Sequence, residues 1–261
     1  METMHWTRVA QAGTLAALVA CGGDDRASAG EAHLAQPAGP VGTGTVTGVV
    51  RFLGTAPPNR AIDMREEPQC RAVYHSAPHQ LTVVVNRNRT LANVFVYVKQ
   101  GLPTSAGYPP PPTPVTLAQR GCQYHPRVFG IMVGQELDVR NNDPLQHGII
   151  AKRVAKRTSA IIQPAAAMTG DHIFRVPEIM VPLECALHPW MRAYVGVVAH
   201  PCFATTDDEG RFTIEHLPNG TYTIEAWHER YGRRTATVTI ADSATRHLTF
   251  TYTAPDAQGT S

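Results

Sequence analysis

Short runs of alternating apolar and polar residues fill most of the chain and predict β-strands separated by turns. Residues 45–52 alternate in this way and end at Gly54, so we expect a strand closed by a turn. Residues 81–85 and 94–98 flank the polar stretch 86–89, a pattern that predicts a β-hairpin. Few long runs show the 3.6-residue period of a helix. The predicted fold class is therefore all-β.

The C-terminal part of the chain has too few predicted strands to fold by itself. Residues 206–227 alternate around Asp-Glu-Gly and Pro-Asn-Gly turns, and residues 235–252 predict two further strands. About four strands in about fifty residues would bury little apolar surface. Residues 44–54 and 92–99 could supply the missing strands. We therefore expect a small, discontinuous β-sandwich with another domain inserted into it or packed against it.

The composition fits a globular protein and gives little evidence of a charged partner. The chain has 261 residues, 43% of them hydrophobic and 17% charged, which is enough for one large or two small domains. Its formal net charge of +2 supports neither a nucleic-acid platform nor a strongly basic membrane surface. We therefore expect no nucleic-acid partner.

The N-terminus resembles a bacterial lipoprotein signal. Arg8 precedes the apolar run 12–20, which ends directly before Cys21. A run this short cannot span a bilayer, whereas a secretory signal needs only a short apolar core. The resemblance implies a lipid anchor on Cys21 and an extracytoplasmic location, on the periplasmic side or the cell surface of a bacterial membrane. A plain cleaved signal peptide is the alternative. Residues 22–41 predict a flexible tether.

One short loop carries the strongest chemical signal in the chain. Cys185, His188 and Met191 put a thiolate, an imidazole and a thioether within seven residues. Two His and one Cys in a trigonal plane, with a weak axial Met, form a ligand set that suits copper. Structural zinc sites usually use several thiolates and no Met. The alternative is a buried structural Cys beside a Pro-Trp turn.

A copper site of this kind needs a second imidazole from elsewhere in the chain. His147 is the best placed, because it follows the alternating run 136–139 and an Asn-Asn-Asp-Pro turn. His125, His172 and His200 are the competing candidates, and His172 ranks second among the histidines. The predicted metal ligands are therefore the four residues His147, Cys185, His188 and Met191.

These residues resemble the cupredoxins, or type 1 blue copper proteins, and most closely amicyanin and plastocyanin. The C-x2-H-x2-M spacing is similar to the short amicyanin-type ligand loop, and residues 192–198 are similar to the strand that closes that fold. The resemblance implies a Greek-key β-sandwich around one mononuclear copper ion. Cupredoxins usually have Asn after the first His and Ser or Thr after the Cys, whereas this chain has Gly148 and Ala186.

The C-terminal alternating segments resemble carboxypeptidase regulatory-like and carbohydrate-binding-like β-sandwich modules. That resemblance leaves glycan binding open, with Trp227, His228 and Tyr231 as a stacking surface, although a core position is the alternative for Trp227. The expected organisation has six parts: a signal peptide (1–21), a tether (22–41), an N-terminal β region (42–113), a copper domain (114–200), a C-terminal sandwich (201–253) and a tail (254–261).

The five cysteines divide among four roles. With Cys21 on lipid and Cys185 on copper, an odd number remains for an oxidising compartment. We predict a disulfide between Cys70 and Cys122, because each lies in an irregular stretch flanking the same hairpin and linker. Such a bond needs the two Cα atoms within about 7 Å. Cys202 would then be a buried free thiol.

The motifs favour an electron carrier over an enzyme. The sequence has no G-x-S-x-G, H-E-x-x-H or phosphate-binding glycine motif. The cupredoxin resemblance implies a membrane-anchored blue copper protein that carries single electrons between a redox protein donor and a redox protein acceptor. The alternative is a carbohydrate- or protein-binding lipoprotein, or a copper storage or delivery protein, in which copper is structural or absent.

Overall fold

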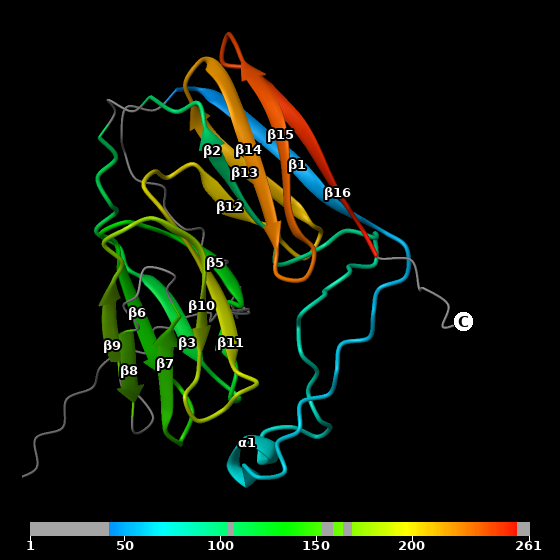
Figure 1. Ribbon diagram of the computed structural model, residues 1–261, viewed down its shortest axis with the longest axis vertical. Helices are drawn as coiled ribbons and strands as arrows, with labels where there is room; N and C mark the ends of the chain where they lie inside the picture. The colour runs from blue at the N-terminus through cyan, green and yellow to red at the C-terminus, as the bar shows by residue number, and fades with distance from the viewer. Residues whose placement is uncertain (1–41, 104–106, 153–158, 164–168, 255–261) are drawn as a thin grey trace, which may run out of the picture. The chain divides into compact units, whose positions relative to one another are not determined.

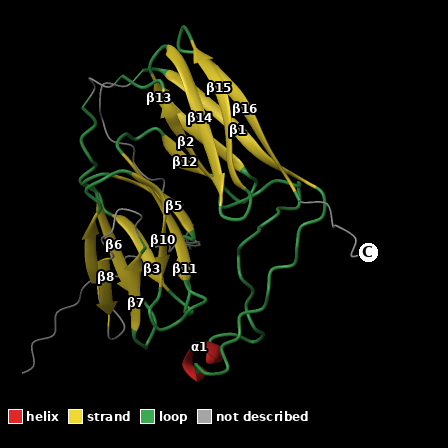
Figure 2. Ribbon diagram, in the orientation of Figure 1, coloured by secondary structure: helices red, strands yellow, loops and turns green. Residues whose placement is uncertain are grey.

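A computed structural model of the chain describes residues 42–103, 107–152, 159–163 and 169–254, with the side chains of 159–163 and 169 left out. Nearly all of its regular structure is β-strand, with one short helix (Figure 2). The predicted all-β fold class is confirmed. The signal peptide and tether expected at residues 1–41 lie outside the described residues.

The elements, in chain order, are β1 (Gly44–Leu53), α1 (Pro68–Ala72), β2 (Phe95–Gln100), β3 (Val115–Gln119), β4 (Tyr124–His125), β5 (Val128–Met132), β6 (Glu136–Asn141), β7 (His147–Ala151), β8 (Ser159–Gln163), β9 (Thr169–Ile173), β10 (Glu178–Glu184), β11 (Arg192–Val198), β12 (Phe203–Thr205), β13 (Arg211–Leu217), β14 (Gly220–His228), β15 (Gly232–Ile240) and β16 (Thr245–Thr253).

The C-terminal sandwich is built from both ends of the chain. Its sheets have the strand orders β13-β1-β16 and β12-β2-β14-β15 (Figure 1). Strand β1 is central, antiparallel to β13 and parallel to β16, and β2 lies between β12 and β14. Val46 and Val50 of β1 are fully buried in one cluster with Ile214 and Ile224. Strands β1 and β2 thus complete the C-terminal sandwich, as expected from the small number of strands that the C-terminal segment predicts.

The second sandwich is formed by the strands from β3 to β11. Its sheets have the orders β5-β11-β10-β7-β8 and β4-β3-β6-β9 (Figure 1). Strands β7 and β10 are antiparallel, with Ile150 opposite Glu184 and Ala151 opposite Leu183. This register puts the first residue of β7 and the residue after β10 at the same end of the sheet. The two segments with the predicted ligands therefore meet there.

The predicted hairpin of residues 81–85 and 94–98 is wrong. Residues 81–85 contain only an isolated bridge from Val85 to Leu91, and β2 pairs with β12 and β14. The Asn59 side chain gives one physical reason, because its amide donates to the Val83 carbonyl and its oxygen accepts from the Val83 N–H. A side chain from outside the hairpin thus satisfies backbone groups that a partner strand would use.

Between β1 and β2 the chain makes a long excursion that contains α1. The helix begins at Pro68, a position where the missing N–H removes no helical hydrogen bond. Ile62, Met64 and Cys70 from this excursion are buried in the core of the second sandwich. Cys70 forms a disulfide with Cys122, with the two Cα atoms 5.7 Å apart. The excursion is therefore covalently tied to the sandwich that carries the predicted ligands.

Two paired glycines let aromatic rings from other strands pack closely on the second sandwich. Gly130 of β5 lies opposite Gly196 of β11. A Cβ on Gly196 would lie 2.4 Å from the Phe95 ring, and one on Gly130 would lie 2.3 Å from the Phe203 ring. Any larger residue at either position would displace these rings. Phe95 belongs to a separate buried cluster with Val128, and the partly buried Phe203 packs against that cluster.

Candidate metal centre

Two sheet strands and one tight loop position the candidate ligands. His147 is the first residue of β7, Cys185 directly follows β10, and His188 lies between β10 and β11. The loop is closed by two backbone hydrogen bonds. The N–H of Cys185 donates to the Met191 carbonyl at 3.2 Å, and the N–H of Met191 donates to the His188 carbonyl at 2.9 Å. The loop that carries the candidate ligands thus folds back on itself at the end of the sheet.

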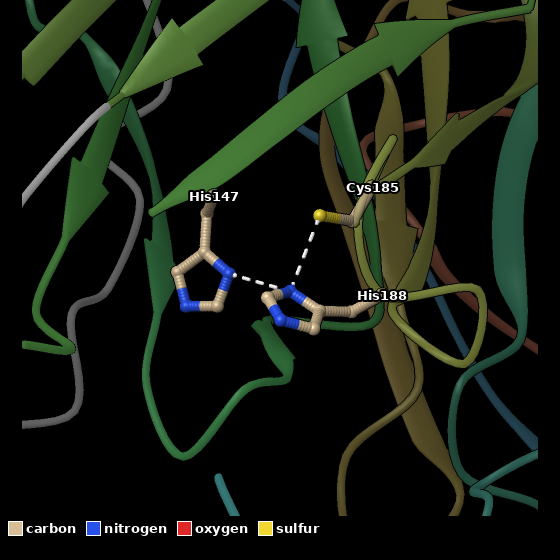
Figure 3. Close-up of side chains that lie close together, drawn as sticks. All are labelled: His147, Cys185 and His188. Atoms are coloured by element: carbon tan, nitrogen blue, oxygen red, sulfur yellow. Dashed lines mark hydrogen bonds between the residues drawn. The ribbon is translucent and has the colours of Figure 1, made fainter. Parts of the chain in front are cut away.

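The two imidazoles and the thiol converge on one point in the interior. Figure 3 shows the Nδ1 atoms of His147 and His188 facing each other with the Cys185 sulfur beside them. The two Nδ1 atoms are 3.0 Å apart, and Cys185 Sγ is 3.6 Å from His188 Nδ1. All three residues are buried, with exposed fractions of 0%, 6% and 2% for His147, Cys185 and His188.

The donor set fits a copper ion. One ligand atom from each of the three residues lies within 4.8 Å of the other two. The separations of 3.0 and 3.6 Å are short enough for these atoms to share one metal ion, since metal–nitrogen and metal–sulfur bonds measure about 2.0–2.3 Å at zinc sites. A thiolate with two imidazoles matches the equatorial set of blue copper sites. Met191 lies in the same loop and the same buried cluster as Cys185, and its axial role stays a prediction.

A carboxylate that the sequence analysis did not single out completes the surroundings of His147. Asp143 Oδ2 accepts a hydrogen bond from His147 Nε2 at 2.8 Å. The same carboxylate accepts from the backbone N–H of Gly121 at 2.6 Å and of Cys122 at 2.8 Å. Asp143 stands in the Asn-Asn-Asp-Pro segment, which predicted only a turn. The sequence feature that could have identified Asp143 is its position four residues before the candidate ligand His147.

Hydrogen bonding prepares the thiol to act as a thiolate. Burial raises the pKa of Cys185, but hydrogen bonds with His147 and His188, and with the backbone of Gly148 and Leu187, lower the pKa to about 5. Unperturbed cysteine thiols have pKa values of about 8.5. The thiolate form is therefore already populated at neutral pH before any metal binds.

His147 and Asp143 are both charged in the metal-free protein, because the hydrogen bond between them stabilises the cation and the anion. Burial lowers the pKa of His147, but hydrogen bonds with Asp143 and Cys185 raise the pKa to about 9. Burial raises the pKa of Asp143, but the hydrogen bonds from His147 and from the backbone of Cys122 and Gly121 hold it below its usual value. The His147 imidazolium thus lies between the Asp143 carboxylate and the Cys185 thiolate. The attraction between these opposite charges compensates for the desolvation cost of burying all three.

A second group of possible ligand atoms does not form a separate site. Cys122, Asp143 and His147 also lie within 4.8 Å of one another. The sulfur of Cys122 is in the disulfide with Cys70 and is not available as a thiolate. Asp143 and His147 already belong to the first cluster, so this group describes the surroundings of the same centre.

The competing histidines lie elsewhere in the fold. His172 is on β9, opposite Leu137 of β6, and its ring meets Phe174 edge-on at 4.5 Å between centroids. His125 is on β4, and the ring of His200 lies near that of Tyr108. Within the described part of the chain, none of these three belongs to a possible metal-binding group.

The outer side of His188 faces a groove formed with the α1 excursion. Its Nε2 is 3.9 Å from a carboxylate oxygen of Glu67. The Trp190 ring lies 5.3 Å from the His188 ring, and Trp190 Nε1 donates to the Cys122 carbonyl at 3.0 Å. The groove is lined by Glu67, Pro68, Gln69, Leu145, Gln146, Leu187 and His188. Among the three clustered candidate ligands, His188 is the one that lines this groove.

The residues considered for glycan stacking are partly occupied by other contacts. His228 is 1% exposed and lies against the Tyr231 ring at 4.9 Å between centroids. The Trp227 ring packs against Tyr194 of β11 at 5.0 Å. These contacts favour a packing role for Trp227 and His228, and glycan binding by the module stays a prediction.

Comparison with known proteins gives one family match, to the C-terminal module. Residues 193–253 match the carboxypeptidase regulatory-like domain. The matched range contains β12 to β16 and leaves out β1 and β2, which the structure places in the same sheets. No curated protein matches the chain. The resemblance of the C-terminal segments is therefore confirmed for part of the chain.

Solved structures similar to this chain include amicyanin, a purple cupredoxin and a copper-containing nitrite reductase. A Cu(I) form of an amicyanin point mutant is 16% identical, covering 32% of this chain and 80% of that one with a TM-score of 0.29. A purple cupredoxin from Nitrosopumilus maritimus is 20% identical, covering 31% and 97%, with a TM-score of 0.27. The copper-containing nitrite reductase from Thermus scotoductus SA-01 is 22% identical, covering 38% and 25%, with a TM-score of 0.29.

The contrast between the two free cysteines predicts selective alkylation. In the metal-free protein, Cys185 should react with iodoacetamide at a rate that rises as the pH passes about 5 and is level above it. Cys202 should stay unmodified at neutral pH, because burial raises its pKa to about 12. Peptide mass mapping across a pH series measures both sites. A Cys185 rate that keeps rising to pH 9, or equal labelling of Cys202, would contradict the assignment.

Proposed function

We propose that this protein is a blue copper protein that carries single electrons between redox partners outside the cytoplasm. The observation that supports the proposal is the convergence of His147 Nδ1, His188 Nδ1 and Cys185 Sγ in a buried cluster at the end of one sheet. In this proposal these three atoms would hold the copper ion, and the Met191 thioether would be a fourth, weaker donor. Bound there, copper would exchange one electron between Cu(I) and Cu(II).

The positions of the candidate ligands on rigid elements support the proposal. Strands β7 and β10 are hydrogen-bonded neighbours in the interior of a sheet, so His147 and Cys185 are carried by rigid elements. The two backbone hydrogen bonds of the ligand loop restrain His188 and Met191. A site that cannot rearrange freely imposes one geometry on both oxidation states. Each electron transfer would then require little movement of the protein.

The charge state of the cluster suits a soft metal ion. Cys185 is already a thiolate at neutral pH, so copper need not displace a proton from sulfur. His147 is protonated in the metal-free protein and would release that proton when Nδ1 binds the metal. The thiolate donates strongly to Cu(II) and is also a favourable ligand for Cu(I). The residues therefore support both redox states.

Burial of the cluster favours electron transfer over turnover of a bound substrate. His147 is fully buried, and Cys185 and His188 are exposed by only a few per cent. A substrate would need a free coordination position, and these side chains occupy the interior with no large exposed face. We propose that electrons leave through His188, whose outer side meets the groove that contains Leu187 and Glu67.

We also propose that the chain is exported and lipid-anchored through Cys21. The Cys70–Cys122 disulfide supports export, because disulfides persist mainly in oxidising compartments. Among the described residues, no helix is long and apolar enough to cross a membrane. Cys21 itself lies outside those residues, so the lipobox-like sequence carries this part of the proposal.

The blue-copper proposal predicts that Cys185→Ser abolishes an intense visible absorption band of the copper-loaded protein. The reason is that the thiolate, and not the imidazoles, would produce the charge-transfer band. Visible spectra at matched copper content measure the effect. His172→Ala is the control and should leave the spectrum unchanged, since His172 is on β9 outside the cluster. A wild-type protein that takes up copper without this band would exclude the proposal and favour a binding-module role.

The axial assignment predicts that Met191→Gln keeps copper and colour but lowers the reduction potential. An amide oxygen is a harder ligand than a thioether and stabilises Cu(II) relative to Cu(I). Voltammetry of the wild-type and variant proteins measures the difference. An unchanged potential with an unchanged spectrum would show that Met191 is a core residue and no ligand.

The lipid-anchor proposal predicts that Cys21→Ala releases the protein from the membrane fraction or blocks its processing. The apolar run before Cys21 would be removed on maturation, so the mature chain would have no other anchor in that region. Fractionation of a bacterial expression host, with intact mass of the product, tests this. A variant that stays membrane-bound with the processed wild-type mass would refute the anchor.

A further inference from the structure

One buried carboxylate contacts both the candidate metal centre and the turn that carries the disulfide. Asp143 is 4% exposed and accepts three hydrogen bonds. Its Oδ2 accepts from His147 Nε2 at 2.8 Å and from the Cys122 N–H at 2.8 Å, and its Oδ1 accepts from the Gly121 N–H at 2.6 Å. The outer nitrogen of His147, Nε2, and the turn that carries the disulfide are therefore joined through a single side chain.

We propose that Asp143 is a positioning residue that fixes the orientation of His147 and links the metal centre to the Cys70–Cys122 disulfide. Holding Nε2–H of His147 leaves Nδ1 pointed at His188 Nδ1, 3.0 Å away. The ring thus has its metal-binding nitrogen placed before a metal arrives. The copper readouts below rest on the proposed function, whereas the orientation of His147 can be measured without metal.

The three donors around Asp143 require an acceptor with two oxygens. A carboxylate has only acceptor atoms, whereas an asparagine side chain has one oxygen and an NH₂ group that donates. In Asp143→Asn, that NH₂ group would face at least one of the three N–H groups. The Asn141 side chain also restrains the backbone of residue 143, because the Asp143 N–H donates to Asn141 Oδ1 at 3.0 Å. Asparagine therefore conserves the shape of Asp143 but not its role.

The turn opposite Asp143 is held from several sides. Gly121 and Cys122 have φ values of 62° and 54°, the left-handed conformation, and both N–H groups point at the carboxylate. The Gly121 carbonyl accepts from the Tyr74 hydroxyl at 2.7 Å, and the Cys122 carbonyl accepts from Trp190 Nε1 at 3.0 Å. Tyr74 belongs to the excursion that Cys70 ties down. Breaking the disulfide should therefore loosen the turn that orients Asp143.

The hydrogen bond also affects the ligand strength of His147. A carboxylate that accepts from the outer nitrogen of a ligating imidazole makes the other nitrogen a stronger donor. A stronger nitrogen donor stabilises Cu(II) more than Cu(I). Loss of the Asp143 charge should therefore weaken Cu(II) binding and raise the reduction potential. A residue that served only to stabilise the fold would change the unfolding midpoint without this shift in potential.

The first experiment compares Asp143→Asn with Asp138→Asn in the full chain. Asp138 is a matched control, because it is also a largely buried carboxylate and pairs with Arg140 on strand β6. Asp143→Asn should keep the thiolate band, bind Cu(II) about 10–100-fold more weakly and have a higher reduction potential. Asp138→Asn should match the wild type in both. Asp143→Asn values equal to those of Asp138→Asn would overturn the proposal.

The second experiment tests the link to the disulfide with a double-mutant cycle. The Cys70→Ser/Cys122→Ser protein should show weaker copper binding in the same direction as Asp143→Asn. Combining all three changes should give a smaller loss than the product of the separate fold-changes, because both act on the orientation of His147. Strictly multiplicative losses would refute the link between the disulfide and Asp143.

A third measurement uses the metal-free wild-type protein and depends on neither copper nor the folding of a variant. The Nε2 proton of His147 should give an NMR signal that is protected from exchange with water, because it is held by Asp143 in the interior. An Nε2 proton that exchanges as fast as that of an exposed histidine would overturn the positioning role. If the protein shows no thiolate band with copper but this proton is protected, the blue-copper function fails and the role of Asp143 in orienting His147 stands.

Discussion

The antiparallel pairing of β7 with β10 is the constraint on which the candidate metal centre depends. Ile150 lies opposite Glu184, so the chain enters β7 and leaves β10 at the same end of the sheet. His147 occupies the first of these positions and Cys185 follows the second. A shift of this register by one residue would turn one of the two ligands to the other face of the sheet. The pairing thus decides whether a thiolate and an imidazole from distant segments can share one ion.

The charges of the cluster depend on this placement. A buried thiolate is costly by itself, and a buried imidazolium or carboxylate is equally so. In this site Cys185, His147 and Asp143 lie in a chain of hydrogen bonds in which positive and negative groups alternate. The backbone N–H groups of Gly121 and Cys122 satisfy the remaining carboxylate sites. The interior therefore holds three charged groups that suit metal binding, because each one compensates for its neighbour.

The excursion between β1 and β2 gives the centre a feature that a minimal sandwich would lack. It supplies Glu67 near the outer side of His188, and it supplies Cys70, which is bonded to the turn beside Asp143. The same excursion separates two strands that belong to the C-terminal sandwich. The segment thus leaves one sandwich, packs in the core of the other beside the candidate metal centre, and returns to the first. This arrangement also explains why residues 193–253 do not contain all the strands of the module they match.

The sequence alone determined the features that depend on near neighbours in the chain. Alternation predicted an all-β fold, and the spacing of Cys185, His188 and Met191 predicted one ligand loop, because seven residues in a tight loop cannot separate their side chains far. The shortage of strands at the C-terminus indicated a discontinuous sandwich, and the count of cysteines with their irregular surroundings suggested the pairing of Cys70 with Cys122.

Only the tertiary structure decided the contacts between distant segments. The His147–His188 contact joins residues 41 positions apart, and it exists because β7 and β10 are paired in one register. Asp143 looked like part of a turn until the fold brought the amides of Gly121 and Cys122 to its carboxylate. One reason that the hairpin prediction failed is that the Asn59 side chain, 24 residues away, hydrogen-bonds the backbone N–H and carbonyl of Val83. Local patterns specify strands and loops, whereas the partner of a buried polar group is chosen by the packing of the whole chain.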